Sequence, residues 1–168
     1  ISEISAKSNI LCKDKHVLCL TDTTEYNYNS LQHKLKEYEL GRISNNKSLG
    51  IFAHPVLIVD AEDLMPLGFA DINLWTRDPN LPTKHVRKID QQPIKKKESY
   101  KWITSLKNTN KTITTAKTKT LIADREGDLY HLFNESLGGK TEIISRARHD
   151  RRLLDEEDSL YQYLEKKS

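Results

Sequence analysis

The sequence has few of the residues that crosslink a protein or carry it through a membrane. Cys12 and Cys19 are the only cysteines among 168 residues, which is too few for a disulfide framework, and their spacing is not that of a metal site. We therefore expect two ordinary thiols in a reducing cytoplasm. No apolar run approaches the roughly 18 residues that would cross a bilayer, so no membrane-spanning helix is expected.

Methionine is equally scarce, and the rest of the chain has the composition of a folded domain. Met65 is the only methionine and the sequence begins with Ile1, so we expect a fragment of a longer protein. A chain of this length is enough for one domain that buries roughly 68–70% of its unfolded surface. With 36% hydrophobic and 30% charged residues, the composition favours a globular protein over a disordered tail.

Acidic residues are scarce in one segment of the chain. The formal net charge is only +3, but residues 84–119 hold eleven Lys or Arg against two acids. Lys and Arg neutralise phosphates and release counterions without special geometry, so a dense basic stretch suits contact with DNA or RNA. Lysine-rich surface helices are also common in proteins that bind no nucleic acid, and charge alone leaves both readings open.

Short apolar runs alternate with amphipathic segments. The apolar runs predict strands at residues 16–22, 50–60, 67–76, 119–124 and 141–148. The second and third of these strands are joined by a short loop and are expected to form a hairpin. The amphipathic segments predict helices at residues 30–41, 95–108 and 127–139. Because strands separated by a helix are usually parallel neighbours, this order predicts a mixed sheet with helices on its faces.

Two aspartates end apolar strands that can lie side by side in such a sheet. Asp22 follows the first strand and Asp124 follows the fourth, so their carboxylates are expected to converge. Two like charges resist joint ionisation unless they share a cation, and Mg²⁺ or Mn²⁺ removes that cost. Asp60 also ends a strand, but it enters the hairpin loop and is expected at the opposite edge.

A structural alternative accounts for each aspartate separately. Asp22 can cap the turn that follows it through Thr23 and Thr24, and short polar side chains of this kind often close such turns. Asp124 can do the same through Glu126 and Gly127. Both the metal and the capping interpretations stay open at this point.

Several blocks agree in order and spacing with one known family. They are LTDTTEYNYNS, LGIFAHPVLIVDAEDLMPLGFADINLW, KKKESYKW, LIADREGDLYHLF and EIISRARHDRR. Together they resemble the cut-and-paste DDE transposases of the insertion-sequence-four group, from about Val17 to Leu164.

The resemblance implies a ribonuclease H-like mixed sheet with antiparallel first three strands, then parallel strands, flanked by helices. It implies an incomplete catalytic core over residues 1–155 and the start of an inserted region or a C-terminal tail over 156–168. Asp22 and Asp124 would be catalytic and metal-binding residues that hold Mg²⁺ or Mn²⁺. The activity implied is DNA strand cleavage and strand transfer on transposon ends and target DNA, by a homodimer in the bacterial cytoplasm, at the nucleoid.

The third acid of the family is missing from this chain. The family pattern has Tyr, then Arg three residues later and Glu seven residues after the Tyr, and none of the seven tyrosines here satisfies it. Tyr161 comes nearest, but Leu164 and Ser168 stand at the Arg and Glu positions. We expect the fragment to bind metal weakly and to cut nothing efficiently. The alternative is a catalytically inactive ribonuclease H-like module, left from a decayed transposase, that binds nucleic acid or a protein.

The resemblance also implies DNA-binding roles for basic residues. Arg146, in ISRAR, matches an arginine that contacts DNA beside the active site, where a guanidinium can brace a phosphate. Four lysines match the family's region before KW, which faces DNA or a partner subunit; they are Lys95, Lys96, Lys97 and Lys101. The structural alternative for all five is an exposed, solvated side chain.

Five further residues receive structural assignments. Arg125 and Glu126 are expected to form a local ion pair behind Asp124. His54, within an apolar strand, is expected to be a hydrogen-bonded core histidine rather than a ligand. Trp75 and Trp102 are expected in the core.

Overall fold

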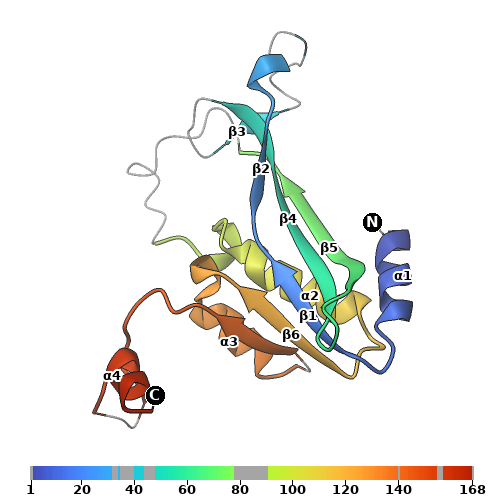
Figure 1. The fold of residues 1–168 in the computed structure, drawn as a ribbon. Helices are drawn as coiled ribbons and strands as arrows, with labels where there is room; N and C mark the ends of the chain where they lie inside the picture. The colour runs from blue at the N-terminus through green and yellow to red at the C-terminus, as the bar shows by residue number, and fades with distance from the viewer. Residues whose placement is uncertain are drawn as a thin grey trace.

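The computed structural model describes residues 2–31, 34, 40–43, 48–77, 91–139, 141–154 and 157–167. Its strands are β1 (His16–Thr21), β2 (Thr24–Asn27), β3 (Gly41–Arg42), β4 (Leu49–Asp60), β5 (Pro66–Trp75), β6 (Thr118–Ala123) and β7 (Thr141–Ser145). Its α-helices are α1 (Ser2–Leu11), α2 (Tyr100–Thr112), α3 (Tyr130–Ser136) and α4 (Leu160–Lys167). The short 3-10 helices are η1 (Asn29–Leu31), η4 (Ile94–Lys96) and η5 (Arg125–Gly127). Figure 1 shows α1 beside β5 and α2 behind the sheet.

The strands form one mixed sheet whose central order is β5-β4-β1-β6-β7, with β2 and β3 also paired to β4. β4 pairs antiparallel with both β1 and β5. β6 pairs parallel with both β1 and β7. The antiparallel strands β1 to β5 come first in the chain and the parallel strands β6 and β7 follow across helices, which confirms the predicted ribonuclease H-like mixed sheet flanked by helices.

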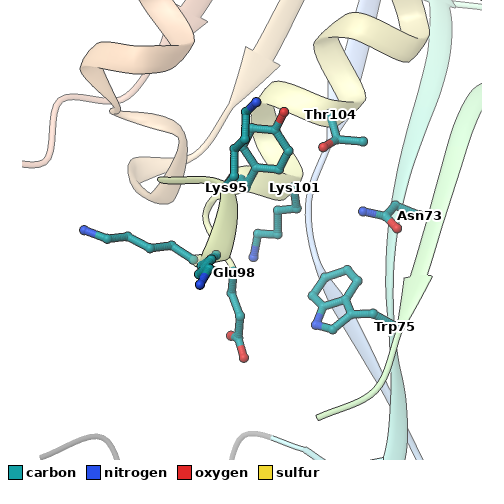
Figure 2. A pocket seen from close by; sticks show the side chains of 9 residues that line it. Asn73, Trp75, Lys95, Glu98, Lys101 and Thr104 are labelled. Atoms are coloured by element: carbon teal, nitrogen blue, oxygen red, sulfur yellow. The ribbon is translucent and has the colours of Figure 1, made fainter. Parts of the chain in front are cut away.

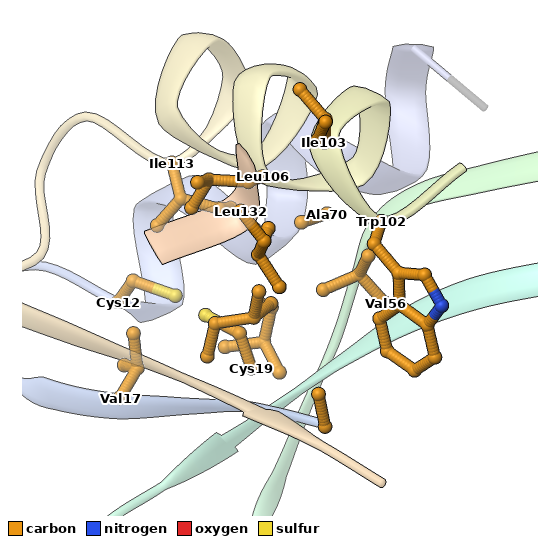
Figure 3. Close-up of a cluster of buried hydrophobic side chains, with 13 residues drawn as sticks. Cys12, Val17, Cys19, Val56, Ala70, Trp102, Ile103, Leu106, Ile113 and Leu132 are labelled. Carbon is orange, nitrogen blue, oxygen red and sulfur yellow. The ribbon is translucent and has the colours of Figure 1, made fainter. Parts of the chain in front are cut away.

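The core lies between the sheet and the helices α2 and α3. Alternate residues of the strands face inward, as Val17 and Cys19 do on β1, and both are fully buried. α2 presents Trp102, Ile103 and Leu106 to this face, and all three are 3% exposed or less (Figure 3). The predicted apolar stripe of this helix is therefore confirmed for these three residues.

The two cysteines are buried and free, as expected of ordinary thiols. Burial is the main cause that raises the pKa of Cys12 to about 11 and the pKa of Cys19 to about 12. Both sulfur atoms are therefore protonated at neutral pH and act as small apolar groups of the core. Within the described ranges, no helix combines the length and the apolar character needed to span a membrane.

One predicted helix begins later in the structure than expected. α2 begins at Tyr100, five residues later than predicted, because Pro93 is followed by a 3-10 turn that holds Lys95 and Lys96. The helix predicted at residues 30–41 lies largely outside the described residues. The division proposed after residue 155 also falls outside them and stays a prediction.

The structure adds a helix that the hydrophobic pattern did not indicate. α1 packs against β5 through serines, and its buried residues are Ser5 and Ser8. Gly68 on β5 has φ +117°, and a Cβ atom there would lie 2.3 Å from the Ser8 hydroxyl oxygen. Glycine therefore permits the close approach of helix and strand.

Candidate functional site

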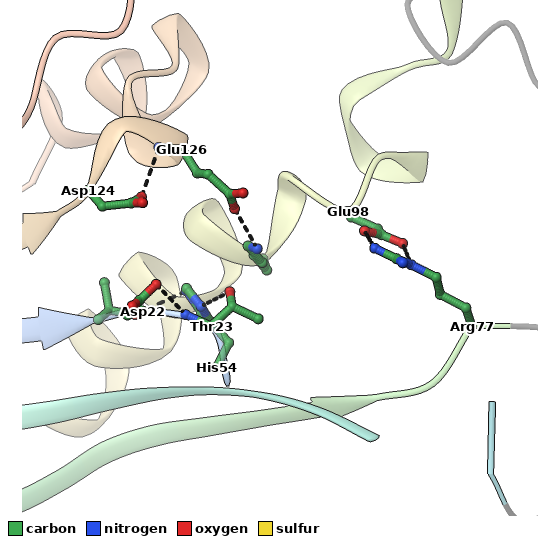
Figure 4. A network of polar contacts seen from close by, with 9 residues as sticks. Asp22, Thr23, His54, Arg77, Glu98, Asp124 and Glu126 are labelled. Atoms are coloured by element: carbon green, nitrogen blue, oxygen red, sulfur yellow. Dashed lines mark hydrogen bonds and ion pairs between the residues drawn. The ribbon is translucent and has the colours of Figure 1, made fainter. Parts of the chain in front are cut away.

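Asp22 and Asp124 occupy equivalent positions on neighbouring parallel strands. Leu20 of β1 pairs with Ile122 of β6, and each aspartate lies two residues beyond its member of that pair. Adjacent strands run about 4.8 Å apart, so the register brings the two aspartates to the same edge of the sheet. Figure 4 shows both carboxylates at the ends of these strands. Both side chains are exposed to solvent.

Each aspartate closes its own turn through one carboxylate oxygen. Oδ1 of Asp22 accepts a hydrogen bond from the Thr23 N–H at 2.6 Å. Oδ1 of Asp124 accepts one from the Glu126 N–H at 2.8 Å and so caps η5. The capping expected under the structural alternative is therefore present. Among the described residues, however, no donor reaches Oδ2 of either aspartate, so capping leaves one oxygen of each carboxylate available.

His54 lies directly behind Asp22 and is fully buried. Its Nε2 lies 3.0 Å from the Thr21 hydroxyl and its Nδ1 lies 2.9 Å from the Thr23 hydroxyl. Burial, and next the charge of Lys101, lower the pKa of His54 to about 4, although the Asp22 backbone acts in the opposite direction. The imidazole is therefore neutral at pH 7. His54 is a hydrogen-bonded core histidine, as predicted.

The turn after β6 is held by contacts that are distant in the sequence. Glu126 forms an ion pair with Lys101 of α2, with 3.0 Å between Oε2 and Nζ. The predicted local pair with Arg125 is therefore wrong, because the side chain of Glu126 points toward α2 (Figure 4). Asp128 has a side chain only 4% exposed and accepts a hydrogen bond from the Arg148 N–H at 2.7 Å.

Arg146 lies next to Asp124 through the pairing of β6 with β7. Its N–H donates to the Ala123 carbonyl at 3.4 Å, and the neighbouring Ser145 hydroxyl donates to the Asp124 carbonyl at 3.0 Å. The Arg146 side chain is exposed.

The four predicted DNA-binding lysines line one groove of about 260 Å³ (Figure 2). Its lining residues are Asn73, Trp75, Lys95, Lys96, Lys97, Glu98, Tyr100, Lys101 and Thr104. Lys95 and Lys96 are exposed, whereas the Lys101 side chain is only 10% exposed. Lys101 Nζ lies 5.7 Å from the centroid of the Trp75 ring. The structure thus gathers the lysine run and Lys101 on one surface.

The two tryptophans have different surroundings. Trp102 is 1% exposed and meets His54 edge to face at a centroid distance of 4.6 Å, as expected for the core. Trp75 was also predicted in the core, but it lines the groove with a partly exposed side chain. Its ring stacks on Phe52 at 5.2 Å, which holds the indole at the groove wall.

The other strand-end aspartate lies at the far end of the sheet, as predicted. Asp60 of β4 is opposite Val17, near the start of β1, whereas Asp22 follows the end of β1. Its buried carboxylate forms an ion pair with Lys15. Within the described part of the chain, no group of three or more His, Cys, Asp or Glu side chains gathers in a way that could hold a metal ion.

No protein-family model and no curated protein sequence matches this chain. Among solved structures, it is similar to the piggyBac transposase in a synaptic complex with hairpin DNA, at 11% sequence identity and a TM-score of 0.45. The similarity covers 83% of this chain and 24% of the other, so the chain spans about a quarter of that neighbour. The likeness is too distant to assign residues or chemistry, and it does not show membership of the insertion-sequence-four group.

Proposed function

We propose that this chain is the core of a DDE transposase, which cleaves and joins DNA strands with a divalent metal. The observation that carries the proposal is the placement of Asp22 and Asp124, two residues beyond the Leu20–Ile122 pair on adjacent parallel strands. Each carboxylate keeps Oδ2 clear of hydrogen bonds from the described residues and faces solvent. A pair of acids in this arrangement is costly unless a cation is shared.

The donor set fits Mg²⁺ or Mn²⁺. Magnesium prefers oxygen ligands and is usually held by one or two carboxylates, with water and substrate phosphates in its other positions. Asp22 and Asp124 supply such carboxylates, and no sulfur or nitrogen donor competes for the ion among the residues placed beside them. When bound there, a pair of ions would supply activation of an attacking oxygen and stabilisation of the leaving oxygen of a phosphodiester.

The remaining residues of the site act on the DNA. Arg146 would brace a phosphate next to the carboxylates through its guanidinium. Lys95, Lys96 and Lys97 would neutralise flanking phosphates along the groove, and Lys101 would add charge at its inner wall. This assignment makes DNA the partner, both as transposon ends and as target, with a homodimer formed in the complete synaptic complex.

A second candidate function is a catalytically inactive module that binds nucleic acid or a protein. The observation that favours it is the lack of a third metal ligand beside the two aspartates among the described residues. The reading frame beyond Ser168 distinguishes the two candidates. A downstream Tyr with Arg three and Glu seven residues later supports the transposase, whereas a natural stop soon after Ser168 supports the inactive module.

The metal site is tested by thermal unfolding with manganese. Because the cation relieves repulsion between the carboxylates and binds only the folded state, Mn²⁺ is expected to raise the melting temperature of the wild type. Asp124→Asn is expected to abolish that rise. Asp60→Asn is the matched control, since it removes a strand-end aspartate at the other end of the sheet and is expected to keep the rise. Equal stabilisation of Asp124→Asn and the wild type would exclude this site.

The DNA surface is tested by the salt dependence of binding to a DNA duplex. Removing one lysine that neutralises a phosphate lowers the slope of log K against log salt by about 0.9. The triple variant Lys95→Ala, Lys96→Ala, Lys97→Ala is expected to flatten the slope by up to about 3. Lys107→Ala, Lys111→Ala, Lys117→Ala removes the same charge away from the groove and is expected to leave the slope nearly unchanged. Equal flattening by both triples would place the DNA surface elsewhere.

A further inference from the structure

We propose that His54 is a positioning residue for Asp22, which it orients by bonding to the threonines on either side of it. The inference rests on the proposed function, because it assigns Asp22 to a cation. His54 lies on β4, and its two ring nitrogens reach the hydroxyls of Thr21 and Thr23 at 3.0 and 2.9 Å. No neighbour of His54 in sequence indicates this contact, which arises only from the pairing of β1 with β4.

The two hydrogen bonds of His54 determine the direction in which the Asp22 side chain points. The hydroxyls of Thr21 and Thr23 both reach the imidazole, so these two side chains share one side, and the exposed Asp22 between them takes the other. Thr21 is 7% exposed and its hydroxyl bonds the buried imidazole, which fixes that side as the interior. Asp22 is consequently turned to solvent, toward the edge it shares with Asp124.

The same contacts place one oxygen of the Asp22 carboxylate. The Thr23 N–H donates to Oδ1 at 2.6 Å, so a Thr23 that is held by His54 in turn holds Oδ1. Oδ2 is left to face outward. Two hydrogen bonds, one from His54 to the Thr23 hydroxyl and one from the Thr23 N–H to Asp22, therefore connect the imidazole to the carboxylate that would bind a cation.

His54 is itself rigidly held, which a positioning residue requires. Its ring meets the buried Trp102 indole at 82° between ring planes. On β4 its backbone lies opposite Asn73 of β5, and the preceding Ala53 lies opposite Thr24 of β2. The pairing with β5 and the contact with Trp102 hold the imidazole in the core.

The threonine hydroxyls satisfy the imidazole in either tautomer. A neutral histidine has one donor and one acceptor nitrogen, and a hydroxyl can fill either role. Both bonds therefore persist without any charge on the ring. In metal sites, residues that orient a metal ligand by hydrogen bonds lower the metal affinity by roughly 10–100-fold when they are removed.

The experiment measures Mn²⁺ binding by electron paramagnetic resonance and the melting temperature in EDTA for the same variants. Thr23→Val removes one hydroxyl and keeps the side-chain shape, so it is expected to weaken Mn²⁺ binding about tenfold with little change of melting temperature. Thr23→Ser restores the hydroxyl and is expected to bind within about twofold of the wild type. His54→Gln, which reaches one of the two hydroxyls, is expected to lie between them.

A matched control exists at the opposite end of β1 and β6. His16 Nε2 lies 2.9 Å from the Thr120 hydroxyl, in another histidine–threonine contact between strands. Thr120→Val removes it far from the aspartates and is expected to leave Mn²⁺ binding unchanged. Comparison of Thr23→Val with Thr120→Val separates orientation of Asp22 from a general loosening of the sheet.

Three outcomes overturn the inference. Unchanged Mn²⁺ binding in both Thr23→Val and His54→Gln shows that Asp22 needs no support from behind. If the variants lose Mn²⁺ affinity in proportion to their loss of melting temperature, and Thr23→Ser does not restore the affinity, these residues serve folding alone. A wild type that binds no Mn²⁺ contradicts both the proposed metal site and the inference, whereas normal Mn²⁺ binding by the wild type, Thr23→Val and His54→Gln contradicts the inference only.

Discussion

Lys101 of α2 and Glu126 of the turn after β6 form an ion pair that joins the groove to the segment carrying Asp124. Lys101 Nζ lies 3.0 Å from Glu126 Oε2, and the Glu126 N–H donates to the Asp124 carboxylate. The lysine side chain is 10% exposed and the glutamate side chain 62%. The charge of Lys101 at the groove wall is therefore partly compensated by an acid that solvent reaches.

Removal of that compensation is expected to strengthen DNA binding. Glu126→Gln leaves the charge of Lys101 uncompensated, so that this lysine can contact a phosphate. One added phosphate contact raises the affinity for DNA about fivefold at low salt. The measurement is fluorescence anisotropy of a labelled duplex at low ionic strength. Glu135→Gln is the control, since it releases Lys107 from a comparable ion pair of 3.2 Å outside the groove. Equal tightening by both variants would trace the effect to net charge alone.

Stability is expected to fall as the pH drops from about 6.5 to about 4, partly because of His54. Its pKa is about 4 in the folded protein against the ordinary value of 6.5, so the unfolded chain binds the proton first. The unfolded state is therefore favoured as the pH falls through that window, by up to about 3 kcal/mol. Urea unfolding at pH 7 and pH 4.5 measures the loss. His54→Gln cannot titrate and is expected to lose less; an equal loss would contradict the assignment to His54.

Gly68→Ala is expected to destabilise the protein by about 1–3 kcal/mol. The residue has φ +117°, and the new methyl group would lie 2.3 Å from the Ser8 hydroxyl oxygen of α1. Gly138→Ala is the matched control, because nothing lies within 4 Å of its added Cβ. Chemical denaturation measures both free energies of unfolding. A control variant that loses as much as Gly68→Ala would show that the α1 contact is not the cause.

Asp128→Asn is expected to loosen the segment that follows β7. Burial raises the pKa of Asp128, but hydrogen bonds from the Arg148 N–H and from Arg151 outweigh burial and hold that pKa below its usual value, so the carboxylate is charged in the fold. Loss of that charge leaves Arg151 without its partner and costs about 1–3 kcal/mol. Faster amide hydrogen exchange at Arg148 is the local readout.

A second ion pair provides the comparison for that variant. Asp158 pairs with Lys166 near α4, and both side chains have more access to solvent. Asp158→Asn is therefore expected to change the free energy of unfolding by less than about 0.5 kcal/mol. Similar costs for Asp128→Asn and Asp158→Asn would mean that burial adds nothing at Asp128.

The sequence predicted the buried strands well because burial on both faces leaves a visible apolar run. β1, β4, β5 and β6 fall within two residues of their predicted bounds, and the hairpin is present. The placement of Asp22 and Asp124 followed from the strand order. α1 was missed because Ser5 and Ser8, rather than apolar residues, face the sheet. β2 was missed because all four of its residues are exposed.

The contacts around the aspartates were not predictable from local pattern. The bonds of His54 depend on the register of β4 against β1, and the pair of Glu126 with Lys101 joins residues 25 positions apart. Neither has a signal in spacing or composition. Lys95, Lys96 and Lys97 were predicted on a helix because they precede an apolar stripe. Pro93 and the 3-10 turn instead place them ahead of α2, where they line the groove.

The shared register of β1 and β6 ties the two acids to the packing of the core. Leu121 is fully buried and Ala123 is 7% exposed on the inward side of β6. A slip of one residue between the strands would turn both outward and carry Asp124 out of line with Asp22. The alignment of the two acids is thus kept for as long as the interior of the sheet remains well packed.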